Sequence, residues 1–173
     1  PLLPKNNLPL LRHRKLKDIV LSKDIGISLA WSVICVSLPW LQADWPAGLP
    51  APGAFFTLGF IFVLVFNRSI YHDLHDIQRD LIVGRETLPI LMGRKFRKFF
   101  PLVPLLLTAI LPLAGVATGA LPTRAALLTL CTAYLAGVHV LFKRNKLSDA
   151  TRFDTVVDFS LLLPGILLWF ASL

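Results

Sequence analysis

Residues 51–80 read APGAFFTLGFIFVLVFNRSIYHDLHDIQRD, an apolar run that leads directly into an acidic stretch. Because a membrane span needs about 20 mostly apolar residues, we expect a transmembrane helix over Ala51–Phe66 that runs on to Tyr71. The aspartates that follow are Asp73, Asp76 and Asp80. The stretch predicts a membrane helix with a polar, acidic end.

The composition of the whole chain agrees with a membrane protein. Of its 173 residues, 55% are hydrophobic and only 16% are charged, and the mean hydropathy is +0.67. Soluble domains carry about 25% charged residues, so this chain is too poor in charge for a soluble class. We expect a single all-α domain over residues 1–173, built as a bundle of transmembrane helices.

Five stretches are long and apolar enough, or nearly so, to cross a membrane. They are Ile25–Ala43, Ala51–Phe66, Phe99–Leu121, Ala125–Phe142 and Thr155–Leu173. Cys35 and Cys131 both fall inside these runs, which favours small buried apolar side chains over a disulfide or a metal pair.

The basic residues alternate between the loops. Of the 18 Lys and Arg residues, six precede the first span and none lies between the first and second spans. Seven lie between the second and third spans, one between the third and fourth, and four between the fourth and fifth. The positive-inside rule places the basic loops on the cytoplasmic face. This topology accounts for most of the net charge of +8. Nucleic acid is not an expected partner, because the chain has no motif that binds it.

The three aspartates are spaced three and four residues apart, which places them on one face of a helix. Like charges at this spacing repel unless a cation lies between them. Carboxylate oxygens are ligands that Mg²⁺ prefers, and Mg²⁺ commonly completes its shell with substrate phosphates and water. The alternative is a solvated helix whose acids pair with arginines. The candidate partners are Arg68, Arg79 and Arg85.

The residues after the acids favour a folded site. Gly84 is suited to end the helix in a left-handed C-cap, Thr87 is suited to begin the next element, and Gly93 is followed by the basic pair Arg94 and Lys95. A basic loop that covers an acidic helix is what a metal–diphosphate site needs.

The run DLHDIQRDLIVGRETLPILMGRK at 73–95 resembles the second Asp-rich motif of the UbiA family of intramembrane prenyltransferases, roughly D-x-x-D-x-x-x-D-x-x-x-G-x-x-T-L-P-x-x-x-G. The matching positions are Asp73, Asp76, Asp80, Gly84, Thr87, Leu88, Pro89 and Gly93. Upstream, RKLKDIVLSKDIGISLAW at 14–31 is similar to the family's R-L-K-x-x-x-x-x-K-[DN]-x-x-x-x-x-x-W. It matches at Lys17, Lys23, Asp24 and Trp31.

The resemblance implies a nine-helix bundle that binds a prenyl diphosphate through Mg²⁺ and transfers the prenyl group to an aromatic or other lipophilic acceptor in the membrane. By matching positions, Asp76 and Asp80 are the expected Mg²⁺ ligands, and Asp73 is a third ligand or supports them. Lys17 matches the lysine that contacts diphosphate. Arg79 and Arg85 are further diphosphate-binding candidates, with pairing to the acids and contact with anionic lipid as the alternatives.

Two features depart from the family pattern. The first Asp-rich motif, N-D-x-x-D, is absent from these residues, and Leu10 stands where the family usually has a tyrosine. The chain begins at Pro1, and Met92 is its single methionine. We therefore expect the C-terminal part of a longer enzyme, inactive on its own because half of the metal site lies upstream.

Several residues have two interpretations. His72 and His75 flank the acids and could move the acceptor's proton, or they could be interfacial side chains. Asp154 and Asp158 could face the same cavity, and pairing with Arg152 or snorkelling to the interface is the simpler expectation.

Two other classes of membrane protein also carry acidic residues on their helices. A CDP-alcohol phosphotransferase is disfavoured, because the glycine follows all three acids and no Ala-Arg pair stands between them. The remaining alternative is a membrane transporter, or a non-catalytic membrane fragment with an acidic cation site. That reading predicts acids near the bilayer midplane.

Overall fold

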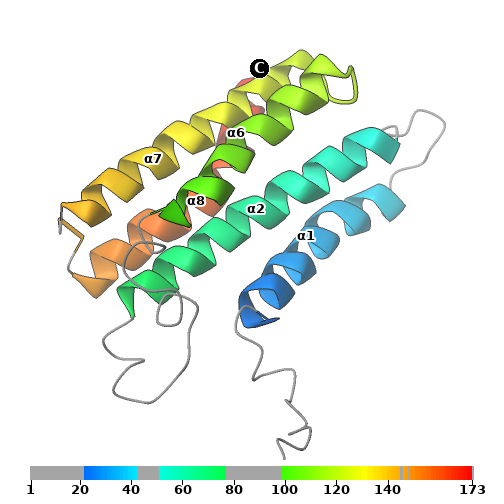
Figure 1. Cartoon of the computed structure of the whole chain (residues 1–173). Coiled ribbons are helices and arrows are strands. Elements are labelled where there is room, and N and C mark those ends of the chain that lie inside the picture. Colours follow the sequence, from blue (N-terminus) through cyan, green and yellow to red (C-terminus); the bar gives the residue numbers. More distant parts are fainter. Residues whose placement is uncertain (1–21, 43–50, 77–98, 145, 148, 173) are drawn as a thin grey trace, which may run out of the picture.

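The computed structural model describes residues 22–42, 51–76, 99–144, 146–147 and 149–172 (Figure 1). The regular elements in these ranges are all helical, as predicted. They are α1 (Ser22–Gln42), α2 (Ala51–His75), α6 (Leu102–Ala117), the 3₁₀ helix η2 (Thr123–Leu128), α7 (Thr129–Lys143) and α8 (Ala150–Phe170).

Each of the five predicted spans overlaps one of the helices α1, α2, α6, α7 and α8. Three helical stretches are long and apolar enough to cross a membrane: Pro52–His75, Thr123–Lys143 and Ala150–Phe170. α6 is a shorter apolar helix. α1 has 21 residues but is not one of these three stretches. Helices satisfy their own backbone hydrogen bonds, which is why apolar runs in lipid adopt this form. The chain is an integral membrane protein.

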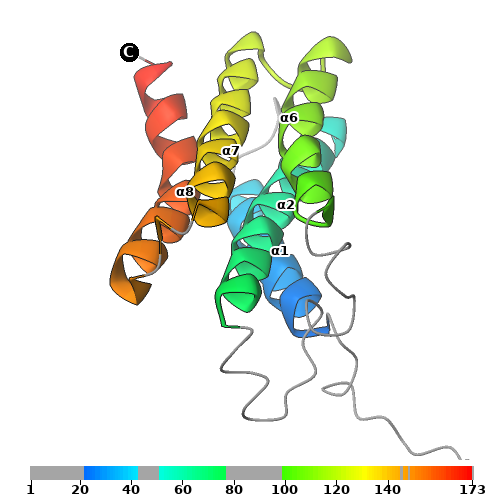
Figure 2. The same ribbon diagram turned by 60° about the vertical axis from the view of Figure 1, so that its left-hand side comes forward.

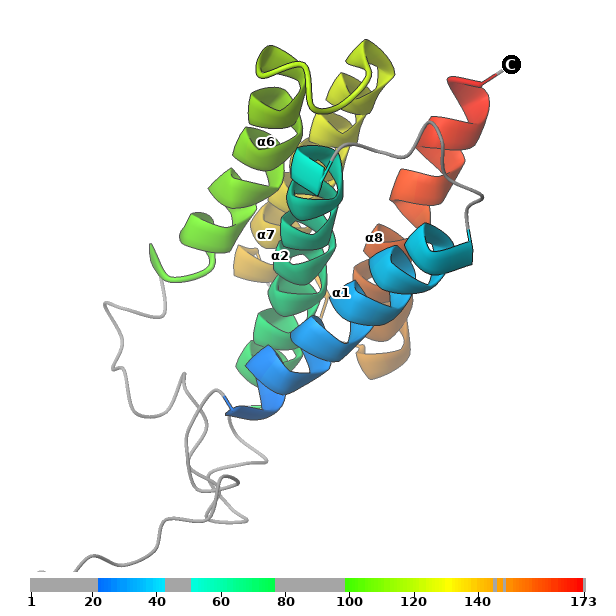
Figure 3. The ribbon, with the colours of Figure 1, turned by 90° about the vertical axis from the view of Figure 1, so that its right-hand side faces the viewer.

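α2 lies at the centre of the bundle and packs against α1, α6 and α8, whereas α7 packs against α6 and α8 (Figures 1 and 2). The helices alternate in direction. The beginnings of α1 and α8 and the ends of α2 and α7 therefore share one end of the bundle. α1 crosses α2 on the outside (Figure 3). The end of α2 is the end to which the acidic stretch belongs.

Local signals explain the helix boundaries near this end and at the opposite one. Asp149 caps α8, because its carboxylate accepts a hydrogen bond from the Thr151 amide at 3.2 Å. At the other end, Gly119 adopts a φ of 72° just after α6, and the Leu121 amide bonds back to the Gly115 carbonyl at 2.9 Å. A left-handed glycine of this kind ends a helix without strain.

Apolar side chains of α2, α7 and α8 form most of the core, and α6 adds Leu105. The fully buried members include Tyr71, Cys131, Leu135, Phe153 and Val157. Many large apolar side chains on the outer faces remain exposed. That is expected of helices that face lipid rather than water.

α1 differs from the other helices because its buried stripe is small and polar. Asp24, Ser28 and Ser32 are buried at four-residue intervals, while Trp31 and other large apolar residues are exposed. The two serine hydroxyls donate to carbonyls of their own helix, at 2.6 and 2.5 Å. Small residues let membrane helices approach closely. Cys35 was expected to be buried but is exposed, because α1 buries only this narrow stripe. Cys131 is buried as predicted, and neither cysteine forms a disulfide.

Candidate functional site

α2 continues past the predicted end of the span at Tyr71 and closes at His75. No glycine or proline interrupts residues 67–75, so the helix passes through the polar residues without a break. Asp73 lies in the last turn. Asp76 follows at once, and its amide still bonds to the His72 carbonyl at 2.9 Å. The acidic stretch therefore starts on the transmembrane helix itself.

One face of the last turns of α2 meets the beginning of α1. The buried carboxylate of Asp24 accepts a short hydrogen bond from the Ser69 hydroxyl. One turn further, the Lys23 ammonium lies 3.9 Å from the Asp73 carboxylate. Asp73 is 8% exposed, so a carboxylate with a nearby cation is buried at the α1–α2 contact.

A second face of the same turns meets α8. Arg68 Nε lies 2.6 Å from Asp158 Oδ1. The His72 ring lies between the two aspartates of α8, with Nδ1 3.6 Å from Asp154 and Nε2 3.4 Å from Asp158. Both ring nitrogens of His72 thus face carboxylates rather than an open space. The geometry is that of an interhelical ion-pair network, which polar groups in membrane helices need.

The network corrects the expectation for Asp154 and Asp158. Arg152 pairs instead with Asp149, three residues away, at 3.5 Å. The reason is geometric, because a helix advances 100° per residue. Asp158 lies six residues after Arg152 and points to a different face, whereas residues three apart are neighbours.

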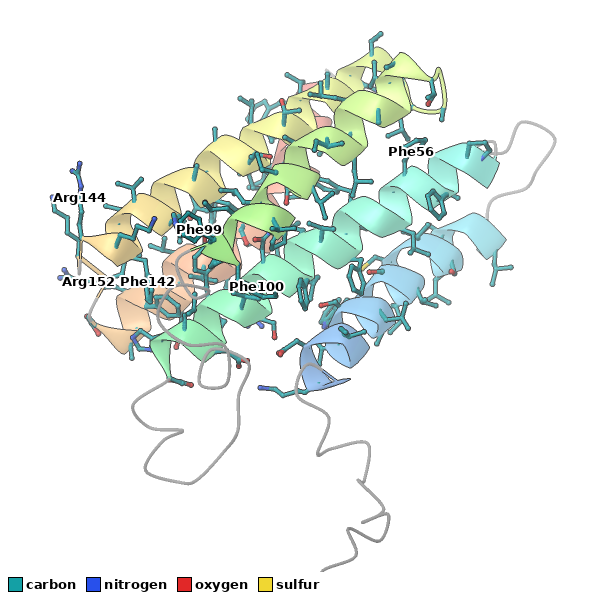
Figure 4. The ribbon with its side chains drawn as sticks, viewed as in Figure 1. Phe56, Phe99, Phe100, Phe142, Arg144 and Arg152 are labelled. Carbon is teal, nitrogen blue, oxygen red and sulfur yellow. The ribbon has the colours of Figure 1, made fainter. Side chains whose placement is uncertain are left out.

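His75 lies against the start of α8. Its ring stacks on Phe153 with centroids 4.3 Å apart and an interplanar angle of 15°, and its Nδ1 is 3.5 Å from the Asp76 carboxylate. Phe142, at the end of α7, also contacts Phe153, with centroids 5.9 Å apart. Figure 4 places Phe142, Arg144 and Arg152 together at this end of the bundle. Aromatic packing thus fixes the α2 end next to Asp76.

Two of the predicted site residues, Asp73 and Asp76, lie in the part of the chain that the structure describes. Their carboxylates are close in sequence but differ in setting, since Asp73 is buried beside Lys23 while Asp76 is half-exposed beside His75. The other predicted site residues lie outside the described residues. They are Asp80, Lys17, Arg79 and Arg85.

Within the described ranges, no group of three or more His, Cys, Asp or Glu side chains is arranged to hold a metal ion. The described donors still suit Mg²⁺, since carboxylates are the ligands it prefers and one or two suffice when substrate phosphates complete its shell. Asp76 is the more accessible of the two carboxylates.

A polar link deeper in the bundle confirms one of two roles that the sequence allows for Asn67, which are to orient a ligand or to satisfy a neighbouring helix. Asn67 is fully buried, and its Nδ2 donates to the Thr108 hydroxyl on α6 at 3.0 Å and to the Val63 carbonyl at 3.1 Å. Sequence reasoning missed the role of Asp24 in docking α1. The repeat of small polar residues at Asp24, Ser28 and Ser32 was the available signal, because a four-residue spacing defines a helix face.

The fold and site define a helical membrane protein with a charged, acid-bearing end on its central helix. Residues 14–163 match the model of the UbiA prenyltransferase family. The chain belongs to this family, whose members are membrane prenyltransferases. No curated protein and no solved structure matches the chain significantly.

Proposed function

We propose that this chain is part of an enzyme that transfers a prenyl group from a prenyl diphosphate to an aromatic or other lipophilic acceptor in the membrane. The observation that carries the proposal is the position of the Asp-rich stretch in a chain of this family: Asp73 ends a transmembrane helix and Asp76 follows it. We assign residues 1–173 to one domain of this type, with the Asp-rich loop on the cytoplasmic face.

Mg²⁺ fits the carboxylates of the proposed site, and when bound it would neutralise negative charge on the departing diphosphate. Asp76 and Asp80 would hold it, and Asp73 would support them. Lys17, Arg79 and Arg85 are proposed to contact the diphosphate through charge-assisted hydrogen bonds. In the reaction the allylic C–O bond breaks, the acceptor forms the new bond to the prenyl carbon, and the acceptor loses a proton.

The described residues have separate tasks in this scheme. The Arg68–Asp158 pair and the His72 contacts hold α8 against α2. The His75–Phe153 stack fixes the turn that presents Asp76. Preorganised charges lower a barrier because they need no rearrangement during the reaction. His72 has both ring nitrogens near carboxylates, so we assign it to this support and not to proton transfer.

The test is an Asp76→Asn exchange in the full-length protein. Loss of a carboxylate that stabilises the departing charge should lower turnover of a labelled prenyl diphosphate by at least about 100-fold. Asp149→Asn is the matched control, since it changes an aspartate at the same end that caps α8, and Asn caps as well as Asp. Equal turnover in the Asp76 variant and the control would remove Asp76 from the mechanism.

A further inference from the structure

Lys23 and Asp73 lie close together but differ greatly in solvent exposure. The Asp73 side chain is 11% exposed, while the Lys23 side chain is 73% exposed. A lysine ammonium has three donor hydrogens and no acceptor. At 3.9 Å from Asp73 it feels the attraction of the carboxylate, but most of its surface still faces outward. Lys23 is therefore a cation held at the acidic end of α2 and open to a second anion.

The packing of α1 against α2 positions Lys23 at this site. Its neighbour Asp24 is buried and accepts a hydrogen bond from Ser69 on α2. The small side chains of Ser28 and Ser32 bury completely and continue the contact along α1. Ser69 and Asp73 lie four residues apart on one face of α2. The Asp24–Ser69 bond thus sets the first turn of α1, and with it Lys23, opposite Asp73.

The guanidinium carried by α2 itself is engaged more tightly. Arg68 lies 2.6 Å from Asp158 on the α8 side, and its side chain is 32% exposed. A ligand would have to compete with that carboxylate for the guanidinium. Lys23 has the longer contact and the greater exposure. Compact ammonium groups bind phosphate as point charges, so Lys23 is the better placed of the two.

The charge balance also calls for a cation. Asp24, Asp73 and Asp76 bring three carboxylates to the end of α2 and the adjoining start of α1. Carboxylates this close to a diphosphate would repel it unless a cation lay between them. We propose that Lys23 binds the diphosphate of the substrate, held by Asp73 and positioned by the docking of α1 on α2. This inference rests on the proposed function, and it assigns Asp73 to orient Lys23 while Asp76 serves the metal.

The experiment measures binding of inorganic pyrophosphate with Mg²⁺ to the full-length protein by calorimetry. Lys23→Gln should weaken binding by at least about tenfold, the loss expected of a charge-assisted hydrogen bond. Lys23→Arg keeps the charge and should stay within about threefold of wild type. Lys143→Gln is the matched control, because Lys143 is an exposed lysine in the last turn of α7 at the same end, and it should leave binding unchanged.

A purely structural role for Lys23 would give a different pattern. It would lower the unfolding midpoint of Lys23→Gln and leave pyrophosphate affinity intact in the folded fraction. We expect the reverse, since the side chain is mostly exposed. In a turnover assay, the KM for prenyl diphosphate should rise while the KM for the acceptor stays constant.

The outcomes separate the two proposals. Wild-type prenyl transfer with equal pyrophosphate affinity in wild type and Lys23→Gln overturns the role of Lys23 and leaves the proposed function standing. Lys23-dependent pyrophosphate binding without any prenyl transfer supports the role of Lys23 and rejects the proposed function. A wild-type protein that does not bind pyrophosphate overturns the role of Lys23.

Discussion

The Arg68–Asp158 pair should contribute measurably to the attachment of α8 to α2. Two unit charges 2.6 Å apart attract by about 1.6 kcal/mol even at the dielectric constant of water, and by more where water is partly excluded. Loss of hydration offsets part of this gain. Interhelical hydrogen bonds in a membrane protein average about 0.6 kcal/mol and reach about 1.7 kcal/mol. We therefore expect a coupling energy of about 1 to 1.5 kcal/mol.

The assay is a double-mutant cycle with Arg68→Gln and Asp158→Asn, measured by reversible unfolding in mixed micelles. The cycle isolates the pair from the other contact of Asp158, which is to His72. Arg152 and Asp149 form the matched control. They are 3.5 Å apart on one helix, and their side chains are 79% and 57% exposed, against 32% and 47% for Arg68 and Asp158.

The control pair should couple by about 0.3 kcal/mol, as exposed pairs within one helix do. An Arg68–Asp158 coupling no larger than that of the control would refute this role of the pair. The two helices would then be held by their apolar contacts alone.

Two further predictions concern α6. The double-mutant cycle of Asn67→Ala and Thr108→Val should give a coupling energy of about 0.6 kcal/mol, and at most about 1.7 kcal/mol, because the two side chains share a buried hydrogen bond of 3.0 Å. A coupling energy of zero, measured by unfolding in micelles, would contradict this prediction. Gly115→Ala should destabilise the protein by about 1 to 3 kcal/mol, because the new Cβ would lie 2.6 Å from Leu121 Cδ1. Gly137→Ala meets nothing within 4 Å and should be neutral or stabilising in the same assay; equal effects of the two would disprove the packing argument.

The helices could be predicted because hydropathy reports directly on their cause. An apolar run in lipid must satisfy its own backbone, and a helix does so within the segment. The exact ends are less predictable. α2 runs to His75 because nothing between Asn67 and His75 breaks a helix, and a hydropathy pattern reports where the apolar part ends and not where the helix does.

The contacts between helices could not be derived from the sequence alone. Arg68 and Asp158 lie 90 residues apart, and Asp24 and Ser69 lie 45 apart. Which faces meet depends on how the helices pack, and many pairings satisfy the same charges. The pairing of Arg152 with Asp149 rather than Asp158 could have been derived from the sequence, because helical geometry favours the residue three positions away.

The candidate site was partly predictable because its acidic residues lie close together in the sequence. The acids are local in sequence, so their spacing placed Asp73 and Asp76 near one another and near the membrane surface. Their different surroundings were not predictable. Burial of Asp73 requires α1, and the exposure of Asp76 depends on where α2 ends.

The central claim is that the full-length protein transfers a prenyl group in a Mg²⁺-dependent reaction. The most direct measurement supplies labelled prenyl diphosphates of several lengths with a panel of aromatic and lipophilic acceptors, in the presence of Mg²⁺ or a chelator. We predict labelled product and released pyrophosphate in equal amounts with Mg²⁺, and neither with the chelator. If the folded full-length protein cleaved none of the prenyl diphosphates under any of these conditions, the result would contradict the claim.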